Sequence, residues 1–90
     1  MKETAHIYFS GRVQGVGFRF TCRSLAIKHS IKGWVRNMPD GRVELLAQAD
    51  SEKIIAFLND LRKEFKGYIL NEETEWLKPE EDYKDFGIRF

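Results

Sequence analysis

The sequence predicts an α+β sandwich of the order βαββαβ, in which two helices cover one face of an antiparallel sheet and a short C-terminal strand follows. Apolar and polar residues first alternate as in a half-buried strand, and the apolar spacing then changes to that of a helix. The succession of strand, helix, Lys-Gly pair and strand occurs twice, as expected for a split βαβ sandwich. A chain of 90 residues, 42% of them hydrophobic and 32% charged, fits one domain, residues 1–90.

The first strand and the first helix are indicated by this change of period. Residues 5–10 alternate between apolar and polar side chains, which predicts a strand with one buried face. From Phe18 to His29 the apolar residues follow helical spacing, so Cys22 is expected in the core. Lys32 and Gly33 come next, and we expect them to end this helix with a basic residue and a C′ glycine.

A hairpin follows the first helix. Residues 34–37 and 43–49 are predicted strands, and Pro39, Asp40 and Gly41 lie between them. These residues predict a turn, because proline presets φ and glycine tolerates a positive φ.

The rest of the chain predicts a second helix and two strands. Asp50 or Ser51 can cap the helix, whose apolar face extends to Phe65 before the second Lys-Gly pair. Residues 68–70 open a fourth strand that resumes near residues 76–77, and residues 86–90 form the final short strand. The acidic residues at 71–75 and 80–82 are expected on the solvated surface.

This order of elements is the ferredoxin-like arrangement. Right-handed crossovers make the first strand and strand 34–37 run in the same direction, so their C-terminal ends lie at one edge of the sheet. The segment that follows the first strand, Ser-Gly-Arg-Val-Gln-Gly-Val-Gly-Phe-Arg-Phe at 10–20, is therefore expected near Asn37.

The glycines of this segment favour an anion site. Gly15 and Gly17 allow successive N–H groups to turn inward as a nest at the start of a helix, where a tetrahedral oxyanion such as phosphate binds. Glycine-rich turns also serve simply to reverse the chain. Arg19 favours the anion, because a cation beside the positive end of a helix dipole is unfavourable unless an anion joins it.

Composition and charge argue against other classes of function. No apolar run reaches the roughly 20 residues of a membrane helix, and the N-terminal residues lack the features of a signal peptide. The net charge of +1 and the absence of aromatic residues from residues 42–49 oppose nucleic-acid binding. The single cysteine cannot form an internal disulfide, which favours the cytoplasm. His6 and His29 have no partners at metal-ligand spacing, and we expect them at the surface or at an edge.

Two linked motifs resemble the signatures of the acylphosphatase family. The first is Gly-Arg-Val-Gln-Gly-Val-Gly-Phe-Arg at 11–19, and the second is Gly-Trp-Val-Arg-Asn at 33–37, followed by Gly41 and Val43. The ending Phe-Gly-Ile-Arg-Phe at 86–90 is also similar to that family. Ala49 departs from it, since the second signature commonly ends in glycine at this position.

The resemblance implies hydrolysis of an acyl phosphate to a carboxylate and inorganic phosphate, without a metal or cofactor. It implies a phosphate-binding loop in which the Arg19 guanidinium acts together with five backbone N–H groups, those of Gln14, Gly15, Val16, Gly17 and Phe18. It also implies that Asn37 orients the attacking water, whereas the residue alone would suggest a cap for the turn that follows. We expect a cytoplasmic monomer that takes a small-molecule acyl phosphate and is inhibited by inorganic phosphate or another oxyanion, with no nucleic-acid or membrane partner.

Two alternatives stay open at this point. The same loop would accept other phosphoanhydrides or phosphate esters, because nothing in it selects the acyl group. The domain would alternatively be a non-catalytic, phosphate- or anion-binding regulatory module of the same fold, although such a module is expected to have lost Arg19 or Asn37, and both are present.

Overall fold

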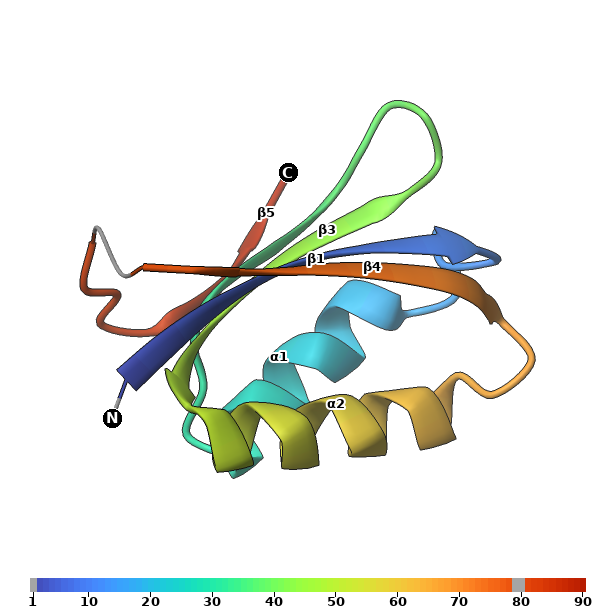
Figure 1. The fold of residues 1–90 in the computed structure, drawn as a ribbon. Helices are drawn as coiled ribbons and strands as arrows, with labels where there is room; N and C mark the ends of the chain where they lie inside the picture. The colour runs from blue at the N-terminus through green and yellow to red at the C-terminus, as the bar shows by residue number, and fades with distance from the viewer. Residues whose placement is uncertain (1, 79–80) are drawn as a thin grey trace.

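The computed structural model describes residues 2–78 and 81–90 and has the element order that the sequence predicts (Figure 1). Both helices lie on the same face of one sheet, as Figure 1 shows. The elements are β1 (Lys2–Gly11), α1 (Phe18–Lys28), β2 (Lys32–Asn37), β3 (Val43–Asp50), α2 (Ser51–Glu64), β4 (Ile69–Leu77) and β5 (Phe86–Arg89).

The sheet has the strand order β4-β1-β3-β2-β5 and is mixed rather than wholly antiparallel. β3 pairs antiparallel with both β1 and β2, so β1 and β2 run in the same direction as predicted. β5 pairs parallel with β2, which the sequence did not indicate. β4 and β5 lie at opposite edges of the sheet. Because β4 is antiparallel to β1 and β5 is parallel to β2, the two edge strands run in opposite directions.

The core lies between the helices and the helix-facing side of the sheet. Cys22 on α1 is fully buried, as predicted, and its burial raises the pKa of the thiol, which stays protonated at neutral pH. The largest buried side chains include residues from both helices and from β1 and β3: Ile7, Phe9, Phe18, Leu45, Ile54, Phe57 and Leu61.

The C-terminal end of α1 differs from the prediction. The helix ends at Lys28 and closes with a Schellman motif, in which Ile31 N donates to Ala26 O at 2.8 Å and Ser30 N donates to Ile27 O at 3.3 Å. Ser30, with φ 58°, takes the left-handed position that the sequence assigned to a glycine. Gly33 lies instead inside β2.

Glycine is required at position 33 because the backbone of β3 lies very close to it. Its φ is +136°, and a Cβ placed on it would lie 1.9 Å from the carbonyl oxygen of Leu46. The absence of a side chain thus lets the backbones of β2 and β3 meet, and this registers Asn37 opposite Val43.

β4 is one continuous edge strand rather than two short segments. The acidic residues at 71–75 form its middle, and all but Glu72 are exposed. Charged side chains on an edge strand discourage pairing with another chain. The lack of apolar alternation explains why the sequence did not indicate a strand here. Glu81 and Asp82 are exposed as expected, whereas Glu80 lies outside the described residues.

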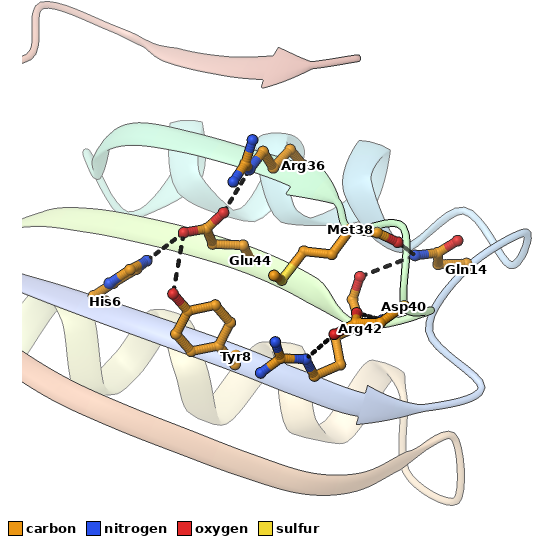
Figure 2. A network of polar contacts seen from close by, with 8 residues as sticks. All are labelled: His6, Tyr8, Gln14, Arg36, Met38, Asp40, Arg42 and Glu44. Carbon is orange, nitrogen blue, oxygen red and sulfur yellow. Dashed lines mark hydrogen bonds and ion pairs between the residues drawn. The ribbon is translucent and has the colours of Figure 1, made fainter.

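The face of the sheet opposite the helices carries a cluster centred on Glu44 (Figure 2). The Glu44 carboxylate, with 7% of its side chain exposed, is 2.6 Å from His6 Nε2, accepts a hydrogen bond from Arg36 Nε, and receives the Tyr8 hydroxyl at 3.4 Å. Burial on its own would raise the pKa of Glu44. The hydrogen bonds with Arg36 and His6 outweigh burial and hold this pKa below its usual value.

Replacing Gly33 with alanine should lower the free energy of unfolding by about 3 kcal/mol or more, because Leu46 and the β2 backbone would have to move. Gly87→Ala on β5 is the matched control, since a Cβ there meets nothing within 4 Å, and it should change stability by less than about 1 kcal/mol. Urea unfolding measures both. Equal stability of the two variants would contradict the close approach.

The Glu44 cluster makes stability depend on pH. A folded-state pKa below the usual value means that ionised Glu44 stabilises the fold above the usual value of 4.5, and this contribution is lost as pH falls through the folded pKa. The unfolding free energy of the wild type should therefore fall more steeply than that of Glu44→Gln between about pH 5 and pH 2. Parallel curves in urea titrations over this range would rule the contribution out.

Candidate active site

The loop between β1 and α1 is anchored at both ends. At its start, Arg12 N donates to the carbonyl oxygen of Tyr68 at 2.8 Å. At its end, Phe18 is 2% exposed and packs against Phe9 and Phe65, with ring centroids 5.1 Å and 4.7 Å apart. The loop is therefore fixed to β1, to the segment after α2 and to the core.

Two glycines of this loop have the positive φ that a nest would need. Gly15 and Gly17 have φ of +75° and +78°, and a Cβ on either would meet nothing within 4 Å. Conformation rather than crowding thus calls for glycine at these two positions, and the space beside them is open. Gly17 is the N-cap of α1. No side chain caps the helix and its first turn holds no acidic residue, so the first N–H groups of α1 are left for another acceptor.

Arg19 lies in the first turn of α1 with its guanidinium unpaired. Among residues 2–78 and 81–90 it makes no hydrogen bond and no ion pair. Its guanidinium carbon is 4.7 Å from the centroid of the Phe90 ring. Stacking on an aromatic ring uses the flat face of a guanidinium and leaves its N–H edge available for a bidentate acceptor. Arg19 and the start of α1 together make this end of the molecule locally positive, despite a net charge of only +1.

Asn37 is the last residue of β2, and its side-chain oxygen has no partner. Oδ1 is buried and accepts no hydrogen bond within the described part of the chain. The turn that follows is closed by its own backbone, since Met38 N donates to Arg42 O at 2.8 Å and Gly41 N donates to Met38 O at 3.1 Å. The Asn37 oxygen therefore does not cap this turn. A buried oxygen without a donor is costly, and a water molecule or ligand would satisfy it.

The residues described above meet at one cavity of about 160 Å³. Five of the residues singled out from the sequence line it: Gly15, Gly17, Phe18, Arg19 and Asn37. Gln14 and Val16, also predicted for the site, are not among its lining residues. The side chain of Gln14 bonds to the β2–β3 turn, and that of Val16 packs on the core. The backbone N–H groups of both nevertheless belong to the loop.

Val13 and Phe20 also line the cavity, and the sequence did not indicate them. Val13 is buried and supports the loop from the core side, which no periodicity in the loop could have shown. Phe20 is 61% exposed on the outer face of α1. The sequence signal that could have found it is an aromatic residue directly after the glycine loop and outside the apolar spacing of the helix.

A larger cavity, of about 250 Å³, lies at the other end of β1. Gln48 within it is already satisfied, since its amide donates to Thr4 Oγ1 at 3.1 Å and to the Glu81 carbonyl oxygen at 2.7 Å, and its oxygen accepts from Tyr83 N at 3.1 Å. Across residues 2–78 and 81–90, His, Cys, Asp and Glu side chains form no group of three that could hold a metal ion. In the same range no helix is long and apolar enough to cross a membrane.

Comparisons with known proteins identify the family of the chain. The family model described as acylphosphatase matches residues 5–88. The acylphosphatase of Syntrophobacter fumaroxidans is 40% identical over 89 residues, which are 99% of this chain and 89% of the relative. The crystal structure of acylphosphatase from Bacillus subtilis superposes with a TM-score of 0.90 at 32% identity and full coverage of both chains. An acylphosphatase structure from Coxiella burnetii gives 0.88 at 34% identity, covering 98% of this chain and 93% of the other. Because the family model and these relatives each cover nearly the whole length of the chain, the chain belongs to the acylphosphatase family.

Proposed function

We propose that the cavity at the glycine loop is the site at which this acylphosphatase holds and cleaves an acyl phosphate. The observation that carries the proposal is the meeting of three unsatisfied groups at one cavity. These are the uncapped N-terminus of α1, the guanidinium of Arg19, and Asn37, a lining residue whose side-chain oxygen is buried; neither side chain has a hydrogen-bond partner among residues 2–78 and 81–90.

The phosphoryl group is bound by the first two of these. The N–H groups of residues 14–18 donate to its oxygens, and the positive end of the α1 dipole stabilises its charge. The free N–H edge of Arg19 donates two parallel hydrogen bonds to the same oxygens. These donors stay in place as the oxygens become planar around phosphorus, so they stabilise the transition state without reorganisation.

The attacking water is bound by Asn37. Its Oδ1 accepts a hydrogen bond from the water and turns the water oxygen toward phosphorus. The oxygen forms the new bond to phosphorus while the bond to the carboxylate oxygen breaks, and the carboxylate leaves with the electron pair. An amide is a poor general base, so the water proton passes to a phosphoryl oxygen, which gives carboxylate and inorganic phosphate. A carboxylate leaves readily, and such a reaction needs mainly positioning and charge stabilisation.

The proposal extends to the setting of the enzyme. We expect a cytoplasmic monomer that binds inorganic phosphate or a related oxyanion as product and inhibitor. A net charge near zero and the lack of a disulfide partner for Cys22 support this setting.

Arg19→Gln should reduce kcat/KM for benzoyl phosphate by ~10²- to 10³-fold or more, because it removes the cation that grips the phosphoryl group. Arg23→Gln is the matched control, since Arg23 lies one turn further along α1 and is exposed, and it should stay close to the wild type. Assays in excess chelator should give the same wild-type rate as assays without it. Equal activity of the two variants, or loss of wild-type activity in chelator, would contradict the proposed site.

Asn37→Ala should lower kcat by ~10²-fold while the dissociation constant for inorganic phosphate changes little, because the water loses its orienting acceptor and the phosphate keeps its donors. Steady-state kinetics and a phosphate titration followed by amide resonances measure the two quantities. A variant that binds phosphate poorly and turns over normally would show that Asn37 has a different role.

Two comparisons separate the alternatives. A wild-type protein that binds phosphate but turns over no acyl phosphate would be the non-catalytic module. Equal turnover of benzoyl phosphate and an aryl phosphate ester would show that the site does not select a carboxylate leaving group.

A further inference from the structure

We propose that the side chain of Gln14 is a positioning residue, which holds the phosphate-binding loop and Asn37 at a fixed separation. The inference rests on the proposed function, because it concerns how two parts of that site are joined. It goes beyond the role expected for Gln14 from the sequence, which used only its backbone N–H group.

The two hydrogen-bond donors of the Gln14 side chain both bind the turn between β2 and β3. Nε2 donates to the carbonyl oxygen of Met38 at 2.8 Å and to that of Arg42 at 2.9 Å. Figure 2 shows the amide of Gln14 beside this turn, with one bond to each side of it. A primary amide is the neutral side-chain group that offers two N–H donors from one nitrogen, so both donors are used here.

The two acceptors flank the end of the strand that carries Asn37. Asn37 pairs with Val43 across the hairpin. Met38 and Arg42 are the next residues toward the turn. A side chain that fixes both carbonyl groups therefore fixes the end of β2. The same side chain projects from the loop that holds Gly15 and Gly17, which line the cavity. Gln14 thus joins the phosphate donors to the water-binding residue without lining the cavity itself.

The turn does not need Gln14 for its own hydrogen bonds. The carbonyl of Arg42 also accepts from Met38 N, and the carbonyl of Met38 also accepts from Gly41 N. Removal of the Gln14 amide leaves neither carbonyl without a donor. The turn should therefore keep its shape and lose only its attachment to the loop, so the change should act on catalysis more than on folding.

The first test is Gln14→Met, which keeps the length of the side chain and removes both donors. It should lower kcat for benzoyl phosphate by ~10- to 100-fold, because loss of alignment between water and phosphorus is felt mainly in the chemical step. The affinity for inorganic phosphate should change little. Gln48→Met is the matched control. Gln48 is a buried glutamine that also bonds backbone carbonyl and N–H groups, but at the far end of β1, and its variant should keep the wild-type kcat even where it is less stable to heat.

The second test is Gln14→Glu, which contains its own control. The introduced carboxylate cannot donate a hydrogen bond and repels the two carbonyl oxygens, whereas its protonated form donates to one of them. Its activity relative to the wild type at the same pH should rise several-fold from about pH 8 to about pH 4, around the usual glutamate pKa of about 4.3. The same ratio for Gln14→Met should stay flat. A merely structural role would give no such recovery.

The outcomes separate the two levels of the inference. A wild-type protein that does not hydrolyse benzoyl phosphate would overturn the proposed function, and the role of Gln14 with it. An active wild type with an unchanged kcat in Gln14→Met, or with flat ratios for both variants, would overturn the role of Gln14 alone. A lowered kcat in Gln14→Met with a pH-dependent recovery in Gln14→Glu would support it.

Discussion

Phe18 packs between Phe9 at the end of β1 and Phe65 after α2, and this contact holds the start of α1 against the core. A helix that begins on a buried ring has a fixed N-terminus, so its free N–H groups and its dipole point in a constant direction. Gly15, Gly17 and Arg19 lie within three residues of Phe18 in the sequence, so the packing of its ring also fixes their positions. Loosening of Phe18 would therefore move the donors of the proposed phosphate-binding loop together.

The second half of the site depends on a close approach within the sheet. Gly33 lets β2 meet β3 and sets the register that ends at the pair of Asn37 and Val43. β1 and β2 end at the same edge because both run against β3. Two elements far apart in sequence thereby bring Arg19 and Asn37 to one cavity. The hydrogen bonds of Gln14 cross the remaining gap between them.

The sequence was sufficient for the order of elements, the direction of β1 and β2, and the loop at Gly15 and Gly17, because these follow from periodicity and backbone preference. It was misleading for Gly33. A Lys-Gly pair is typical of the end of a helix, but here the glycine lies inside a strand, where the backbone of β3 approaches it closely. The parallel pairing of β5 and the contacts of Gln14 depend on long-range packing, which local patterns do not encode. The roles of Arg19 and Asn37 in catalysis stay predictions, although the structure brings both to the cavity.

Cys22 lies one turn after Arg19, on the buried side of α1. As the single thiol of the chain, it is shielded from alkylating reagents until the helix separates from the sheet. The rate at which the Cys22 thiol is alkylated therefore reports how often α1 opens. An anion bound at the start of α1 would lower this alkylation rate in proportion to the fraction of protein that holds it. Anion binding could thus be followed through Cys22 itself, without an added fluorophore or isotope.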